Sequence, residues 1–203
     1  SGAYGSYAER GAATGMSRWR FNCGRIKQEQ MRFLADTIRK YNLTHIHFTT
    51  GQCLQMHGLD GETILQLYKE CYEHGIYNRG AGGDNPNVVA SILRGIDPRE
   101  TFDIMPYATA ISEFLMEQMF YIKLPRKFKM GLDNGFDSTP HATFKDLGFN
   151  LTKHNTFDVY ACGGIGPNPR IGIPVARDVQ PEDVLYHVKA MLMVFANHGN
   201  FKN

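Results

Sequence analysis

The chain has 203 residues, of which 42% are hydrophobic, and this is enough to bury a core in one or two small domains. Its 22 Lys and Arg residues against 20 Asp and Glu give a formal net charge of +2, a balance that argues against nucleic acid as a general partner. No segment approaches the roughly 20 apolar residues that span a bilayer, and no basic-then-apolar N-terminal segment marks secretion, so we expect a cytoplasmic protein with no membrane partner.

The first half of the chain alternates between strand and helix patterns. Polar and apolar residues alternate in the strand segments, whereas apolar residues recur at helical spacing in the segments between them. Asp60 is a suitable N-cap, and Gly75 would end the helix that Asp60 begins. The pattern predicts strands at 16–22, 45–50 and 53–57, helices at 28–41 and 60–74, and a Gly- and Pro-rich loop at 80–86.

The second half predicts a similar mixture of elements, with Pro181 in the first turn of a final helix whose apolar residues form a continuous stripe. The expected elements are helices at 107–120 and from 181 onwards, strands at 124–132, 142–147, 157–161 and 171–175, and a polar loop at 133–140. The predicted class is α+β, with a ferredoxin-like half domain at 1–95 and a second module at 96–203.

The cysteines and histidines do not predict a local metal site. Cys23, Cys53, Cys71 and Cys162 lie far apart without a C-x-x-C pair, which in a cytoplasmic chain argues against disulfides and structural zinc. The eight histidines show no H-E-x-x-H or comparable spacing. A nucleotide-binding loop at 163–169 is also disfavoured, because its prolines forbid the helix that should follow.

Two blocks carry the most information about function. LPRKFKMGLDN (124–134) places Arg126, Lys127 and Lys129 at the head of the expected strand, and the period of two sends both lysines to one face. Because like charges repel, this arrangement suggests an anion between them. YACGGIGPNPRIG (160–172) follows a β-rich run and forms a turn rich in glycine and proline.

These blocks resemble siroheme-dependent sulfite and nitrite reductases, in which LPRKFK is the basic strand that faces siroheme and its anionic substrate. Three further segments are similar to segments of that family: MSRWRFNCG (16–24), HFTTGQCLQMHGL (47–59) and GGDNPNVV (82–89). The resemblance covers most of the chain and implies a ferredoxin-like half domain followed by the first sulfite/nitrite reductase repeat.

The resemblance also implies roles for individual residues. Arg18, Lys127 and Lys129 match the substrate-facing cations, while Gln55 and Arg126 match siroheme-contacting positions. Fixed cations suit this chemistry, because siroheme carries carboxylates and the substrate is a small oxyanion. Lys129 favours sulfite over nitrite, since nitrite-specific relatives often carry asparagine there. The electron donor would be ferredoxin or a flavoprotein.

Two positions depart from the family pattern. Gly51 and Asn87 stand where the resemblance leads us to expect arginines, and each loss removes a charge-assisted contact worth about 1.5–3 kcal/mol. His47 and Arg94 are candidates to compensate for the two lost arginines. We also expect His47 and Asn87 to be among the residues that bind siroheme. The alternative is a non-catalytic or assembly module that kept the fold and lost the siroheme site.

The [4Fe–4S] half of such an enzyme is missing from the sequence, because neither the C-x5-C nor the C-x3-C pattern is present. We therefore expect the N-terminal part of a siroheme and [4Fe–4S] reductase, with no metal site of its own. Alone, the chain is expected to fold, to hold neither cofactor and to be inactive. Its expected partners are a C-terminal half or, in its place, a second copy in a symmetric homodimer.

Overall fold

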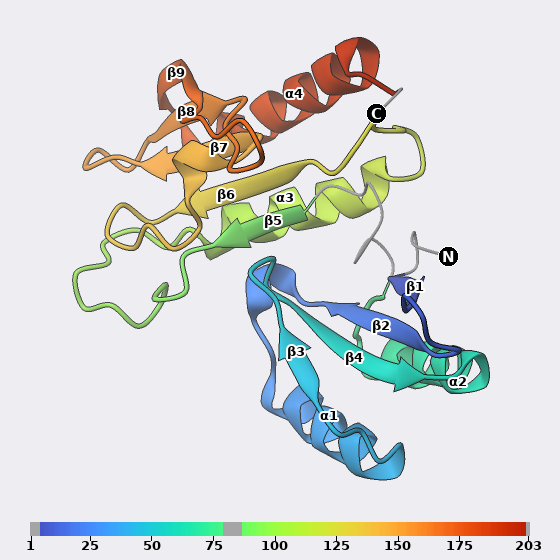
Figure 1. Ribbon diagram of the computed structural model, residues 1–203. Helices are drawn as coiled ribbons and strands as arrows, with labels where there is room; N and C mark the ends of the chain where they lie inside the picture. The colour runs from blue at the N-terminus through green and yellow to red at the C-terminus, as the bar shows by residue number, and fades with distance from the viewer. Residues whose placement is uncertain (1–4, 79–86, 202–203) are drawn as a thin grey trace. The chain divides into compact units, whose positions relative to one another are not determined.

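A computed structural model describes residues 5–78 and 87–201, and the chain divides into two compact units at 1–85 and 86–203 (Figure 1). Each unit has one sheet and its own helices, so the predicted α+β class is confirmed. The division falls earlier than the boundary predicted after residue 95, because β5 (Asn87–Ala90) pairs with a strand of the second sheet. Below, the two units are called unit 1 and unit 2.

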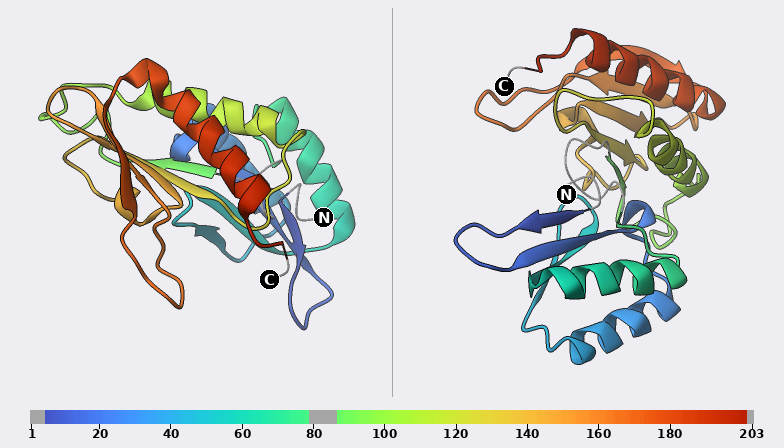
Figure 2. Two further views of the ribbon diagram at one scale, coloured as in Figure 1. Left: turned by 90° about the horizontal axis from the view of Figure 1, so that it is seen from above. Right: turned by 90° about the vertical axis from the view of Figure 1, so that its right-hand side faces the viewer.

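Unit 1 is a four-stranded antiparallel sheet in the order β1-β2-β4-β3, with two helices on one face (Figure 2). The predicted helices and the predicted strands of this unit are present, with small shifts at their ends, and β1 is an additional edge strand. Its elements are β1 (Ser6–Ala8), β2 (Gly15–Arg20), η2 (Asn22–Gly24), α1 (Gln28–Lys40), β3 (Ile46–Phe48), β4 (Cys53–Leu59) and α2 (Gly61–Glu73).

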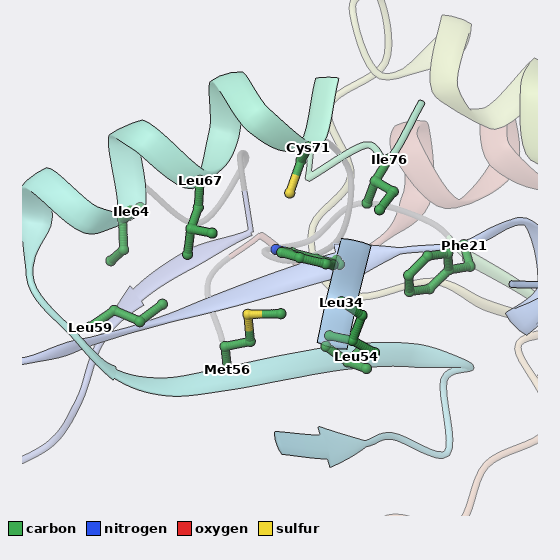
Figure 3. Packing of buried hydrophobic residues seen from close by; sticks show 10 residues of the cluster. Phe21, Leu34, Leu54, Met56, Leu59, Ile64, Leu67, Cys71 and Ile76 are labelled. Atoms are coloured by element: carbon green, nitrogen blue, oxygen red, sulfur yellow. The ribbon is translucent and has the colours of Figure 1, made fainter. Parts of the chain in front are cut away.

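The core of unit 1 lies between its sheet and its helices. Trp19 of β2 and Leu54 of β4 are opposite each other in the ladder and both are fully buried. Figure 3 shows Leu67 of α2 pointing toward the same core. The Asp60 side chain accepts a hydrogen bond from Thr63 N at 2.7 Å, which confirms it as the N-cap of α2.

Unit 2 is a five-stranded sheet in the order β5-β6-β7-β8-β9, parallel from β5 to β7 and antiparallel from β7 to β9. Both of its α-helices lie on one face of the sheet (Figures 1 and 2). Besides β5, its elements are α3 (Met105–Gln118), β6 (Lys129–Asp133), η3 (Ala142–Phe144), β7 (Leu147–Leu151), β8 (Phe157–Ala161), β9 (Ile173–Val179), η4 (Pro181–Asp183) and α4 (Val184–His198).

The strand predicted at 142–147 is wrong: the segment forms the short 3₁₀ helix η3, and β7 begins only at Leu147. The cause is close packing on two glycines that face each other in the ladder, Gly131 of β6 and Gly148 of β7. A Cβ on Gly148 would lie 1.8 Å from the Ala142 carbonyl oxygen. The absence of side chains at these two positions lets η3 rest directly on the sheet.

The strand predicted at 124–132 also begins later, because β6 starts at Lys129 and residues 125–126 form a bend. Lys127 therefore precedes the strand. The backbone still alternates, with Phe128 buried between the exposed Lys127 and Lys129. This alternation agrees with the expectation that the two lysines share a face. The loop predicted at 80–86 lies outside the described residues.

Candidate functional site

In unit 1, three of the residues predicted to bind substrate or cofactor form one row across the sheet. Arg18 of β2 is opposite Gln55 of β4, and Gln55 is opposite His47 of β3. Residues in register share a face, and neighbouring rows on the other face carry the core residues Trp19 and Leu54. The row therefore lies on the face of the sheet that the helices leave open.

Two neighbours fix the direction of the Arg18 guanidinium. When the Gln55 amide is oriented to satisfy both partners, its Oε1 accepts hydrogen bonds from Arg18 Nε at 3.0 Å and from Arg18 Nη2. The Arg18 Cζ lies 5.4 Å from the centre of the Tyr7 ring, in a cation–π contact. The half-buried guanidinium is thus held in a fixed direction, which suits a cation that recognises an anion.

In unit 2, the predicted cations gather where β6 begins. Asn87 is the first residue of β5 and lies directly opposite Lys129, the first residue of β6. Arg126, Lys127 and Lys129 are all exposed, and Asn87 is half-buried. The structure therefore brings Asn87 next to Lys129.

Asp146 anchors the start of β6. Its Oδ2 accepts a hydrogen bond from the backbone N–H of Lys129 at 2.7 Å. Burial raises the pKa of the Asp146 carboxyl, while this hydrogen bond and the charges of Lys129 and Arg126 act in the opposite direction. Asp146 thus fixes the backbone of Lys129 at the point where the lysine side chain leaves the sheet. Neither Asp146 nor its neighbour Lys145 was predicted as a site residue.

The glycine-rich turn after β8 packs against the same region. Gly163 N donates a hydrogen bond to the Lys145 carbonyl oxygen at 2.9 Å, and Cys162 N donates to the Asp146 carbonyl oxygen at 2.9 Å. A Cβ on Gly163 would lie 2.8 Å from the Lys145 carbonyl oxygen. The glycine at this position therefore permits a close approach between backbones.

The positions that depart from the family pattern have clear places in the fold. Gly51 lies in the tight turn between β3 and β4, where Gln52 N donates to the Thr49 carbonyl oxygen at 2.9 Å. Asn87 lies in the row of Lys129, as described above. Of the two residues expected to compensate, His47 shares the row of Arg18, whereas Arg94 donates to the Ser91 carbonyl oxygen at 2.5 Å and follows β5.

The cysteines do not fit the ligand set of an iron–sulfur cluster. Cys23, Cys53 and Cys71 are buried, Cys162 is exposed, and all four are free thiols. Burial strongly raises the pKa of the Cys71 thiol, which disfavours the thiolate that a metal requires. Within residues 5–78 and 87–201, no three His, Cys, Asp or Glu side chains are grouped so that they could hold a metal.

Two family models match consecutive parts of the chain. The nitrite/sulfite reductase ferredoxin-like half domain matches residues 7–74, and the nitrite and sulphite reductase 4Fe-4S domain matches residues 81–203. The chain belongs to the nitrite and sulfite reductase family. The predicted family and the ferredoxin-like half domain are thereby confirmed.

Individual relatives give the same result. The chain is similar to the ferredoxin–nitrite reductase of Synechococcus elongatus (28% identity, 93% of this chain, 39% of the relative). It is also similar to the chloroplastic ferredoxin–nitrite reductase of Spinacia oleracea (30% identity, 91% of this chain, 33% of the relative). These oxidoreductases are much longer, since the chain spans less than half the length of either.

A solved structure shares the fold. The Mycobacterium tuberculosis NirA protein superposes with a TM-score of 0.81 over 99% of this chain and 40% of the NirA chain, at 22% identity. The chain thus shares its fold with part of the NirA protein. In the part of the chain that the structure describes, no helix is long and apolar enough to cross a membrane.

Proposed function

We propose that the protein containing this chain reduces nitrite or sulfite in a multi-electron reaction that depends on siroheme and a [4Fe–4S] cluster. The family membership supports this proposal, and the observation that carries it is the Arg18–Gln55–His47 row, a fixed guanidinium on an open sheet face. The cluster ligands would come from outside the described residues, because the cysteines of this chain do not fit them.

Each unit, taken by itself, offers groups that suit the carboxylates of siroheme. In unit 1, Gln55 and Arg18 are held together at hydrogen-bond distance on the open face. In unit 2, Lys129 and Arg126 supply positive charge beside Asn87. Siroheme, when bound, would supply the redox-active iron that this chemistry requires.

The residues of this chain would perform binding and proton delivery. In unit 1, the Arg18 guanidinium held by Gln55 is the proposed anion-binding group, and in unit 2 the Lys129 ammonium supplies a positive point charge. An ammonium group can also release a proton to oxygen during reduction, so Lys127 and Lys129 are the proposed proton donors. Because Asp146 holds the backbone of Lys129 in place, the Lys129 side chain extends from a fixed position.

The choice between the two anions is tested by measuring the reduction of each anion separately. The names of the relatives favour nitrite, whereas lysine at position 129 favours sulfite. Full-length protein produced with a siroheme supply should show siroheme absorbance and consume nitrite or sulfite with reduced methyl viologen as the electron source. Full-length protein that takes up no siroheme would overturn the proposal and support a non-catalytic module.

The remaining partners are also proposals. Ferredoxin is the donor named for the relatives, and a flavoprotein is the second candidate. We further propose that the isolated chain is cofactor-free and inactive, and that a C-terminal half or a second copy associates with it. Sedimentation of the isolated chain tests the homodimer, and the absorbance of the purified chain tests the absence of siroheme. The cytoplasmic location stays a prediction.

A further inference from the structure

Lys145 is a cation that no role described so far uses. It follows η3, and its stem crosses the face of the second sheet on which η3 lies: a Cβ on Gly131 would lie 3.2 Å from Lys145 Cγ. The Lys145 stem therefore fills the space that a side chain at position 131 would take. Since residues two apart on a strand share a face, this space lies on the same face as Lys129.

The environment of Lys145 differs from that of a solvated surface lysine. The side chain is half-buried, and within residues 5–78 and 87–201 no carboxylate lies within ion-pair distance of its ammonium. Burial lowers the pKa of Lys145, and the charge of Lys129 lowers it further. The charge of Asp146 acts in the opposite direction and raises the pKa of Lys145, but this carboxylate also accepts a hydrogen bond from the backbone N–H of Lys129.

We propose that Lys145 is a further anion-binding residue of unit 2 and that it acts together with Lys129 on one oxyanion group. Lys129 and the stem of Lys145 lie on one face, and the single carboxylate beside them, Asp146, cannot balance two positive charges, so an anion would stabilise the two lysines. The ligand class is an oxygen anion, either a carboxylate of siroheme or the nitrite or sulfite substrate. The inference rests on the proposed function for the identity of these ligands.

The binding test measures the reactivity of each lysine. Trace acetylation of the full-length protein, followed by mass spectrometry, should show that Lys145 is protected when siroheme is bound, when sulfite is added, or both. Protection by siroheme alone identifies a carboxylate of the cofactor, and additional protection by sulfite identifies the substrate. Lys153, an exposed lysine beyond the other end of β7, should react equally in every sample.

Variants separate the charge of Lys145 from its packing. Lys145→Met keeps an unbranched stem over Gly131 but removes the ammonium, so siroheme affinity or the KM for the anion should worsen about tenfold with unchanged folding. Lys145→Arg should restore most of the loss, whereas the matched control Lys153→Met should change neither value. Equal behaviour of Lys145→Met and Lys153→Met would overturn the inference.

The two proposals fail in different ways. If the wild-type protein holds siroheme and reduces nitrite or sulfite, yet Lys145 is protected by neither ligand, only the inference about Lys145 is wrong. If the wild-type protein holds no siroheme, the proposed function is wrong. Sulfite protection of Lys145 in that cofactor-free protein then decides the inference: protection supports it, and unchanged acetylation rejects it.

Discussion

Asp133 is a buried carboxyl whose protonation should affect the stability of unit 2. It is 5% exposed at the end of β6, and its Oδ1 accepts a hydrogen bond from Gly135 N at 2.8 Å. Burial and the charge of Asp137 raise its pKa to about 6, above the ordinary value of an aspartate. The folded protein thus binds a proton that the unfolded protein releases at lower pH.

Asp133→Asn should remove this effect. In the wild type, the free energy of unfolding should fall as the pH rises from about 4 to about 6, because the folded state holds more protons in that window. The variant should match the wild type below pH 4 and exceed it above pH 6 by on the order of 2 kcal/mol. Urea denaturation across this pH range measures the difference.

The control for this prediction is Asp183→Asn, which removes a carboxylate from an exposed position at the start of α4. Its effect should stay below about 1 kcal/mol, because the side chain is exposed. If the Asp133 and Asp183 variants show the same dependence on pH, the buried carboxyl is not the titrating group.

Gln55 should matter because it orients Arg18. Gln55→Leu removes the acceptor that holds Arg18 Nε, so the guanidinium loses its fixed direction and anion binding weakens. In the full-length protein, kcat/KM for nitrite or sulfite should fall about tenfold, the scale of one hydrogen bond to a charged group. Gln66→Leu, on the exposed face of α2, should leave this value unchanged; a drop of equal size in both variants would contradict the assignment.

Among the elements, η3 shows most clearly how sheet and loop depend on each other. Gly148→Ala would place a methyl group 1.8 Å from the Ala142 carbonyl oxygen, so η3 or the backbone of β7 must move. We expect a loss of about 3 kcal/mol in the stability of unit 2, measured by urea denaturation. Gly164→Ala is the matched control, because a Cβ there meets open space, and it should change stability by less than about 0.5 kcal/mol.

Some elements could be predicted from local sequence patterns alone, and others could not. The strand at 157–161 and the helix capped by Asp60 were predicted correctly, since alternation and capping are local signals. The segment at 142–147 was predicted wrongly, because its aromatic and β-branched residues favour a strand. The 3₁₀ helix found there depends on the pairing of Gly131 with Gly148 in neighbouring strands, which leaves room for it on the sheet. β1 and β5 are short strands of three and four residues, and they were not predicted.

The residues of the candidate site also differ in whether the sequence alone could predict them. Arg18, Gln55 and Lys129 were predicted as site residues from motifs that resemble those of the family, and the strand pairing places Gln55 beside both Arg18 and His47. Lys145 carries no motif. Its only signal is its contact with Gly131, which depends on how η3 folds back over the sheet and so cannot be inferred from residue spacing.

For the whole molecule, each unit has its own core, so each should unfold in its own transition. The single tryptophan of the chain, Trp19, is fully buried in unit 1, and its fluorescence therefore reports on that unit alone. Circular dichroism, in contrast, reports on the helices and strands of both units.

Leu67→Ala and Gly148→Ala should separate the two transitions. Leu67 is fully buried in the core that contains Trp19, so its truncation should lower the stability seen by fluorescence by about 2–5 kcal/mol. Gly148→Ala should leave the fluorescence midpoint in place and shift only the remaining part of the circular dichroism transition. If either variant shifts both signals equally, the units unfold together, and stability lost at η3 would then also loosen the Arg18 row.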